Sequence, residues 1–439
     1  MSIELFTLLM FGSFFLLLAV GVPLSWSCLG VAAVFGLILK GTPIFQLLLF
    51  RTYDMMLSFS MAAIPLFIFM AVLLRYSGVA NDLYDAIYTW LGSLRGGLAI
   101  TSVLVCTIVA AMVGVGAAGI TIMGIIALPA MLQHKYDKGI ALGSICAGGT
   151  LGLMIPPSIM FIIYGVNAGE SIGKLFMGGI GPGLVLSALY CLYIGIRASL
   201  QPRLCPAMPK EERVAVSLLA KLSLFRSLVL PCLLILIVLG SIYLGWATPG
   251  EAAGIGAFGA LIIVITRRRL TWSNLKESVY STLSITGMIF WIVFGAYSFI
   301  GVYTIAGGSD FVRELIAGLP FGPWGILMIL IFILIILGMV FDLTGIIILT
   351  VPIFVPLIKE LGFDPLWFGV LFNVTLQIAF ISPPFGYGMF CLKAVTPPDI
   401  TITDIYKSVI PFIGLQIVGL ALCMVFPQIV MWLPSAMIR

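Results

Sequence analysis

Long uninterrupted apolar runs are the feature of this sequence that most restricts its fold. The runs at 4–22, 175–197 and 409–433 contain almost no charged residue, and each has about the 20 residues that an α-helix needs to cross a bilayer. A transmembrane β-barrel would instead show alternating segments of about ten residues. The chain is therefore predicted to be an all-α polytopic membrane protein.

Composition agrees with this prediction. Of the 439 residues, 62% are hydrophobic and 9% are charged, whereas a soluble domain has about 25% charged residues. Such a chain is expected to lie in membrane lipid and not to bind nucleic acid. The eight cysteines are scattered and His134 is the one histidine, so neither a disulfide framework nor a zinc site is expected.

Two apolar stretches, 97–133 and 322–358, are long for one crossing and short for two crossings with a turn. Glycine or polar residues interrupt the middle of each stretch, at 113–119 in the first and at 341–345 in the second. We expect two re-entrant hairpins, in which two half-helices enter and leave the membrane on the same side. Such irregular backbone is tolerated only where protein or a watery cavity surrounds it.

The two halves of the chain repeat the same order of elements. Pro129 precedes Pro156-Pro157 by the interval that separates Pro356 from Pro383-Pro384. Each half is predicted to have five crossings and one hairpin, and this odd number of crossings inverts the second half. Paired broken helices in inverted repeats indicate a secondary transporter. The predicted divisions are a first repeat at 1–198 with hairpin 97–133 and broken helix 139–166, a linker and amphipathic segment at 199–226, and a second repeat at 227–439 with hairpin 322–358 and broken helix 366–393.

Basic residues predict the orientation. Most of the 22 Lys and Arg residues fall in loops on one side of this arrangement, including 267–269 and the linker. Positive loops remain in the cytoplasm, so both termini are expected on the exterior face.

The proline pairs predict a cation site. A proline inside a helix leaves the carbonyl four residues earlier without its donor, so Pro156 frees Gly152 and Pro383 frees Ala379. Freed carbonyls and half-helix ends suit a small hard cation such as Na⁺. The alternative is a pair of kinked helices that only pack against neighbours, and matched breaks in both halves argue against it.

Polar residues in or beside the breaks are the candidates for substrate binding. Asp342 is the one carboxylate in either hairpin centre, and an ionisable residue at membrane depth is a functional candidate by default. Its other role is to cap the following half-helix, and the two roles can coexist. The candidates are Thr150, Ser158, Asp342, Thr344, Asn373 and Gln377.

Enzyme motifs give no competing interpretation. The sequence lacks the Walker A and HExxH patterns. Residues 114–119 and 254–259 match GxGxxG, but neither lies in the strand–turn–helix unit that dinucleotide binding requires. We therefore expect no enzymatic activity and no organic cofactor.

At these motifs the chain resembles the large membrane subunit of the tripartite ATP-independent periplasmic (TRAP) transporters. The resemblance covers nearly the whole length. It is most specific at Ala-Gly-Gly-Thr-Leu-Gly-Leu-Met-Ile-Pro-Pro-Ser (147–158), Ala-Thr-Pro-Gly-Glu-Ala-Ala (247–253), Leu-Gly-Met-Val-Phe-Asp (337–342) and Ser-Pro-Pro-Phe-Gly (382–386). It implies an elevator-type, Na⁺-driven importer of organic acids in the cytoplasmic membrane of a bacterium or archaeon. It also implies two partners, a small membrane subunit of about four helices and a periplasmic substrate-binding protein.

The resemblance also implies two Na⁺ sites. Members often carry serines at the first hairpin tip, where this chain has Val113 and Gly116, so an ion there would depend on backbone carbonyls. The Na⁺-site positions that the resemblance implies are Val113, Gly116, Gly152, Ile155 and Pro157 in the first half, and Gly338, Ala379, Ser382 and Phe385 in the second.

The alternative function is a channel or a permease component without ion coupling.

Overall fold

The computed structural model describes residues 2–207 and 228–437, and within those ranges the regular structure is entirely helical. The helices of the first half are α1 (Ile3–Ala19), α2 (Leu24–Lys40), α3 (Pro43–Met56), η1 (Phe59–Ala62), α4 (Ala63–Tyr76), α5 (Val79–Leu91), α6 (Gly97–Val113), α7 (Gly116–Gln133), α8 (Lys138–Thr150), η2 (Leu151–Leu153), α9 (Ile159–Ala168) and α10 (Ile172–Leu200). Those of the second half are α12 (Val229–Tyr243), α13 (Pro249–Thr266), α14 (Trp272–Ile305), α15 (Gly308–Ala317), α16 (Pro323–Gly338), α17 (Leu343–Glu360), α18 (Pro365–Phe380), α19 (Tyr387–Lys393), α20 (Ile402–Val425) and α21 (Gln428–Ser435). The amphipathic segment expected at 214–226 lies outside the described residues.

Local sequence explains where several helices begin. Thr248 and Glu251 form a capping box at the start of α13, in which the Glu251 carboxylate accepts from the Thr248 N–H at 2.8 Å. Thr401 and Asp404 repeat this arrangement at the start of α20. These boxes satisfy backbone donors that the first helical turn leaves unpaired, so both helix starts are fixed locally.

Seven of the described helices are long and apolar enough to cross a membrane: α4 with η1, α7, α10, α13, α14, α17 and α20. Two of them, α7 and α17, are the second arms of the expected hairpins. Helix α14 is continuous over 34 residues, whereas α3, η1 and α4 at the corresponding place in the first half are separate helices. The second half thus has one long helix where the first half has three short ones.

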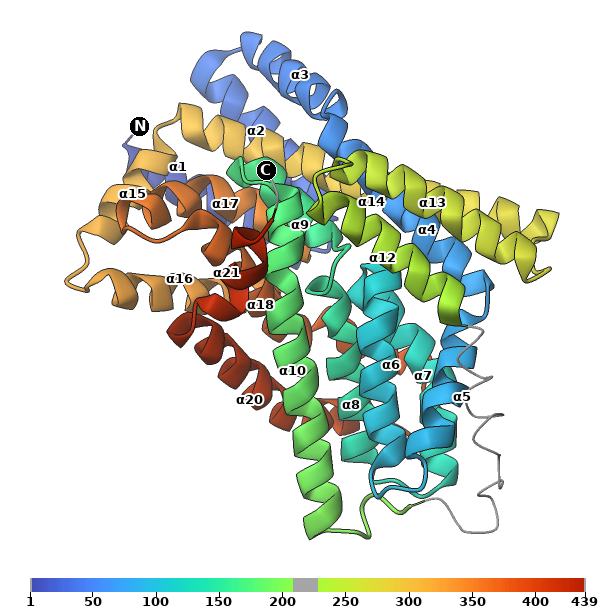
Figure 1. The fold of residues 1–439 in the computed structure, drawn as a ribbon. Helices are drawn as coiled ribbons and strands as arrows, with labels where there is room; N and C mark the ends of the chain where they lie inside the picture. The colour runs from blue at the N-terminus through green and yellow to red at the C-terminus, as the bar shows by residue number, and fades with distance from the viewer. Residues whose placement is uncertain (1, 208–227, 438–439) are drawn as a thin grey trace.

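The helices pack into two groups (Figure 1). In one group α2 packs on α14, α4 packs on α13 and α14, and α12 packs on α13. In the other group α8 packs on α6, α7 and α20, while α10 packs on α6, α18, α20 and α21. Hairpin arm α6 contacts α4, and hairpin arm α17 contacts α14, so each hairpin lies against a helix of the first group.

Contacts recur between the two halves. Helix α2 packs on α14 as α13 packs on α4, and α8 packs on α20 as α18 packs on α10. Hairpin arm α17 packs on α9, and hairpin arm α7 packs on α19. Each hairpin therefore contacts the second part of the broken helix from the opposite half.

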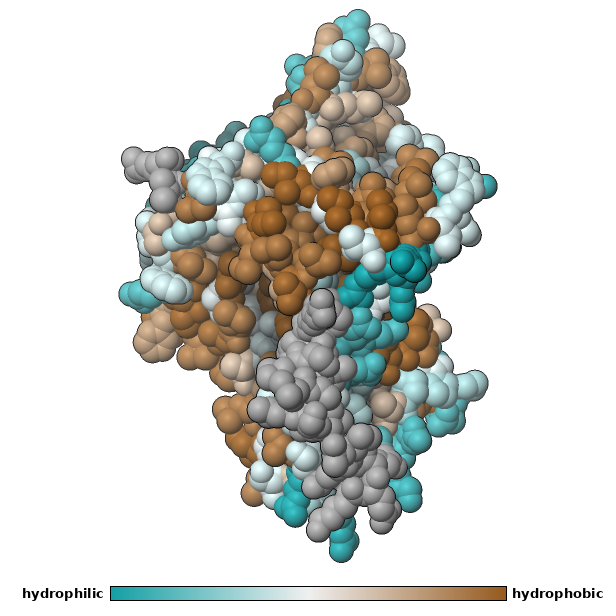
Figure 2. Space-filling model, turned by 45° about the vertical axis from the view of Figure 1, so that its right-hand side comes forward, coloured by the Kyte–Doolittle hydropathy of each residue, from teal (hydrophilic) through white to brown (hydrophobic). Residues whose placement is uncertain are grey.

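The outer surface carries many large apolar side chains. Figure 2 shows a broad hydrophobic band on one face of the molecule, and Trp246, Leu200 and Leu8 are 70–80% exposed. Apolar patches of this extent mark contact with a membrane or with another protein. The outer surface thus has the character expected of a membrane protein.

Candidate functional site

The first hairpin turns sharply at its tip. Helix α6 ends at Val113 and α7 begins at Gly116, with Gly114 in the left-handed conformation at φ +64°. A side chain in this conformation brings Cβ too close to the carbonyl oxygen that follows. The glycine at position 114 is therefore required by the turn, whereas Gly116 does not have a positive φ.

The first tip lies against the first broken helix. A Cβ atom at Gly114 would collide with the carbonyl oxygen of Pro157, and one at Gly152 would lie 3.4 Å from the carbonyl oxygen of Val115. Gly119 approaches the Gly149 carbonyl oxygen in the same way. The backbone of the tip and the backbone of the break thus approach each other closely at positions that have no side chain.

Within the first break, α8 continues as the short 3₁₀ helix η2 and the chain then turns at Pro156-Pro157. The Ser158 hydroxyl donates to the Leu153 carbonyl at 2.8 Å, so this carbonyl has found a side-chain donor in place of the one that Pro157 lacks. Pro156 has no N–H to offer to Gly152. Ser158 therefore satisfies the carbonyl of Leu153 but not that of Gly152.

The second break differs in detail from the expectation. The Ala379 carbonyl accepts a hydrogen bond from the Ser382 N–H at 3.1 Å, because the chain tightens into a turn before Pro383. The expectation that Pro383 leaves this carbonyl without a donor is therefore wrong. A carbonyl oxygen has a second lone pair, so Ala379 can still contribute to a cation site. The Ser382 hydroxyl donates to the Ile378 carbonyl.

The second hairpin tip carries the carboxylate. Asp342 is the N-cap of α17, and its side chain accepts from the Thr344 N–H at 2.9 Å. Gly338, the last residue of α16, lies directly against the methyl group of Ala379. Asp342 is exposed on this chain, and Thr344 beside it is buried.

Among the substrate-binding candidates, the structure brings Thr150 and Gln377 together. The Gln377 Nε2 donates to the Thr150 Oγ1 at 2.8 Å. Asn373 lies one turn earlier on α18 and donates to the Gly369 carbonyl of its own helix. Ser158 is fully buried at the first break. Asp342 and Thr344 form a separate group at the second tip.

The candidate ion ligands fall into two groups with different fits to Na⁺. In the first half, the Pro157 carbonyl oxygen lies against Gly114 and the Val115 carbonyl oxygen lies beside Gly152, and neutral oxygens of this kind at unwound helices suit Na⁺. In the second half, Gly338 and Ala379 are in contact, while Phe385 lies on an exposed turn with its side chain 62% exposed. No cluster of three or more His, Cys, Asp or Glu side chains suited to a metal occurs among residues 2–207 and 228–437.

The sequence analysis missed two buried polar residues beside this site. Gln416 of α20 donates to the Thr150 Oγ1 at 3.3 Å, and Tyr190 of α10 lies beside them and is fully buried. Gln416 stands alone among apolar residues in the first half of the run 409–433, and this was the available signal. Periodicity within one helix could not reveal which neighbour that glutamine faces.

An all-helical membrane protein with two broken helices, each in contact with a hairpin tip, belongs to the class of membrane transporters. The family described as "Tripartite ATP-independent periplasmic transporter, DctM component" matches residues 11–429. The chain is a member of this family and is a large permease subunit of a TRAP transporter. This confirms the resemblance that the motifs indicated, and its relatives are permease components and not enzymes.

Two relatives and one solved structure illustrate the similarity. The chain is 32% identical to the C4-dicarboxylate TRAP transporter large permease protein DctM of Pseudomonas aeruginosa, and the match covers 93% of each chain. It is 31% identical to the isethionate TRAP transporter permease protein DctMQ of Oleidesulfovibrio alaskensis, over 96% of this chain and 65% of that protein. The fold resembles the YdaH transporter of Alcanivorax borkumensis with a TM-score of 0.65 at 14% identity, over 93% of this chain and 98% of that one.

Proposed function

We propose that this chain is the translocating subunit of a Na⁺-coupled importer of organic anions. The observation that carries the proposal is the packing of the first hairpin tip on the first break, which places the Pro157 carbonyl oxygen against Gly114 and the Val115 carbonyl oxygen beside Gly152. Neutral carbonyl oxygens at an unwound helix suit Na⁺. In the second half, the contact of Gly338 with the Ala379 methyl group places the second tip directly beside the second break.

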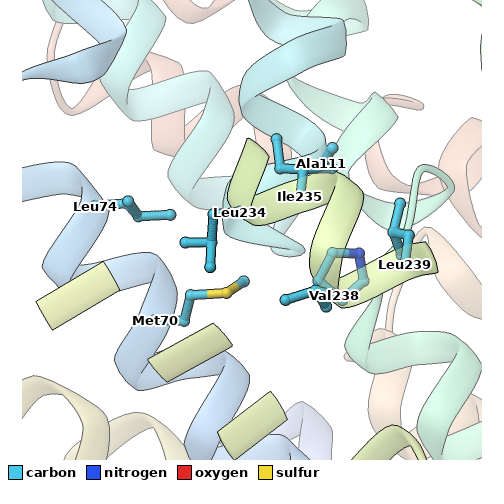
Figure 3. Close-up of a pocket in the computed structure, with 8 residues that line it drawn as sticks. Met70, Leu74, Ala111, Leu234, Ile235, Val238 and Leu239 are labelled. Carbon is cyan, nitrogen blue, oxygen red and sulfur yellow. The ribbon is translucent and has the colours of Figure 1, made fainter. Parts of the chain in front are cut away.

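The two halves act as inverted repeats, and the second helix group moves as an elevator against the first. Reciprocal packing of α2 on α14 and of α13 on α4 supports the repeat. Figure 3 supports the motion, because apolar side chains from α12 and α4, including Leu234, Val238 and Met70, surround a small cavity that Ala111 and Pro157 also line. An interface without polar contacts at this place offers little resistance to sliding.

The substrate is an organic acid that binds between the hairpin tips. Thr150 and Ser158 lie at the first break and Asn373 lies within α18. The half-helix α9 begins at the first break, and α7 and α17 begin at the two hairpin tips. Half-helix N-termini carry partial positive charge that favours a carboxylate or another anion. The P. aeruginosa relative is named for C4-dicarboxylates and the O. alaskensis relative for isethionate, and both ligands are small organic anions.

The transporter works with two partners, a periplasmic substrate-binding protein and a small four-helix membrane subunit. The family is described as tripartite and periplasmic. This chain covers only 65% of the relative named DctMQ, which leaves room there for a fused small subunit. This chain lies in the cytoplasmic membrane, with both termini on the exterior face.

Reconstitution tests the proposal. Proteoliposomes that contain the chain and its small subunit should take up substrate only with an inward Na⁺ gradient and the loaded binding protein. Uptake that is identical in Na⁺ and in choline would contradict ion coupling. Counterflow distinguishes the alternative function, because a channel or uncoupled component shows no saturable exchange of internal for external substrate.

A further inference from the structure

Two buried glutamine side chains, Gln377 and Gln416, donate to the hydroxyl of a third buried residue, Thr150. The Thr150 Oγ1 donates to the Ala147 carbonyl at 2.7 Å and accepts from the Nε2 atoms of Gln377 at 2.8 Å and Gln416 at 3.3 Å. All three polar side chains are completely buried. A hydroxyl on α8 therefore receives donors from α18 and from α20.

These hydrogen bonds are what hold the two carboxamides in place. Neither the Gln377 Oε1 nor the Gln416 Oε1 has a hydrogen-bond partner within the described part of the chain. A buried carbonyl oxygen without a donor is costly, so each amide depends on its one bond to Thr150. Loss of that hydroxyl would release two side chains from two different helices.

The junction adjoins both candidate half-sites. Thr150 directly precedes η2, which contains Gly152, and Gln377 lies two residues before Ala379. The two bonded residues are 227 positions apart, which is also the interval from Pro129 to Pro356 and from Pro156 to Pro383. The bond therefore joins corresponding positions of the two halves.

We propose that Thr150, Gln377 and Gln416 form a positioning junction that couples the two half-sites, with Gln416 as a positioning residue that acts through Thr150. The proposal rests on the Na⁺ coupling of the proposed function. Movement of η2 when an ion binds in the first half shifts Thr150, and Thr150 then displaces Gln377 and the turn at Ala379. Coupling between two sites of this kind typically changes affinity by about 5- to 150-fold.

Na⁺ titration of thermal stability tests the junction without the need for a known substrate. Binding to the folded state raises the unfolding temperature, so the purified permease gives a Na⁺ curve, with choline as the control salt. Gln416→Met keeps the volume and removes the amide, and we expect the half-saturating Na⁺ concentration to rise by at least about five-fold and the curve to lose cooperativity. Ser408→Ala is the matched control, because Ser408 is buried on the same helix and bonds only to Ile405 of that helix.

Thr150 variants make the test specific to the junction. Thr150→Val should reproduce the shift, Thr150→Ser should keep the wild-type curve, and Gln416→Met should add less than about two-fold to Thr150→Val, as expected for residues in one network. This Thr150 pair also decides the question if Gln416→Met does not fold. Three results would overturn the junction. The first is a set of variants whose Na⁺ curves equal that of the wild type. The second is the same Na⁺ curve for Thr150→Val and Thr150→Ser, and the third is a double variant in which the two single shifts simply multiply. A wild-type protein that responds equally to Na⁺ and choline would instead overturn the proposed function itself.

Discussion

The two hairpin tips are built differently although they occupy corresponding places in the chain. At the first tip Val113 and Gly114 are buried, as is Pro157 in the break that they meet. At the second tip Val340 is 59% exposed and Asp342 is also exposed. The first tip is sealed and neutral, whereas the second is open and charged.

The two hairpin tips are therefore kept in place by different kinds of contact. The first tip relies on close backbone contacts that only glycine permits, at Gly114 and Gly119. The second tip relies on side chains, namely the cap from Asp342 to Thr344 and the methyl group of Ala379. We therefore expect the first tip to fail by steric change and the second by loss of charge.

Gly114→Ala should have the largest effect. The added Cβ meets a left-handed φ, which costs roughly 1–2 kcal/mol, and it also collides with the Pro157 carbonyl oxygen. We expect transport to fall by more than about ten-fold, since about 1.4 kcal/mol corresponds to a factor of ten. Uptake by proteoliposomes, normalised to reconstituted protein, measures the loss.

Gly169→Ala is the matched control for this prediction. Gly169 has a φ of +68°, and a Cβ atom there would meet nothing within 4 Å. The control therefore has the backbone strain without the collision. Equal losses of transport in the two variants would mean that the contact with Pro157 is unimportant.

Cysteine labelling compares the two tips directly. In a background without native cysteines, Val340→Cys should react with a membrane-impermeant maleimide about ten-fold faster than Val113→Cys, because Val113 is only 8% exposed and thiol reactivity requires access. Equal rates would remove the contrast between the two tips.

The fold was more predictable than the site, for a physical reason. A run such as 409–433 predicts a membrane helix from its own composition, and Pro156-Pro157 predicts a break from the missing N–H donors. Contacts between helices leave no such local trace. Gln416 meets Thr150 only because α20 packs on α8, and the Ala379 carbonyl is paired because of how the chain turns ahead of Pro383. Asp342 remained open to two roles, and the structure establishes only the cap.

Asp342→Asn tests the charge of the second tip. Asparagine caps helices about as well as aspartate, so folding should be retained while the charge is lost. We expect transport to fall by about five-fold, which corresponds to about 1 kcal/mol of electrostatic stabilisation near a helix N-terminus. Uptake at fixed Na⁺ and substrate, with the amount of folded protein measured separately, gives the result.

Asp364→Asn provides the comparison for Asp342→Asn. Asp364 caps α18 and accepts from the N–H groups of Leu366 and Trp367, so the substitution makes the same change at the start of the second broken helix, outside the tip. Its transport should stay within about two-fold of wild type. Wild-type rates in both variants would reduce Asp342 to a helix cap.

Val113→Ser should have the smallest effect, and it tests whether the neutral first tip coordinates Na⁺. The change supplies a side-chain hydroxyl at a tip that otherwise offers only backbone oxygens. A net gain of about 0.5 kcal/mol, at the low end for a polar contact, would lower the half-saturating Na⁺ concentration for uptake by about two-fold. The double variant with Gly116→Ser extends the series: Gly116 has no positive φ, but its new Cβ would lie 3.0 Å from the Leu153 side chain, which must yield. An active double variant with an unchanged Na⁺ dependence would show that the first tip does not bind the ion, and the contrast between the tips would then be one of access and charge alone.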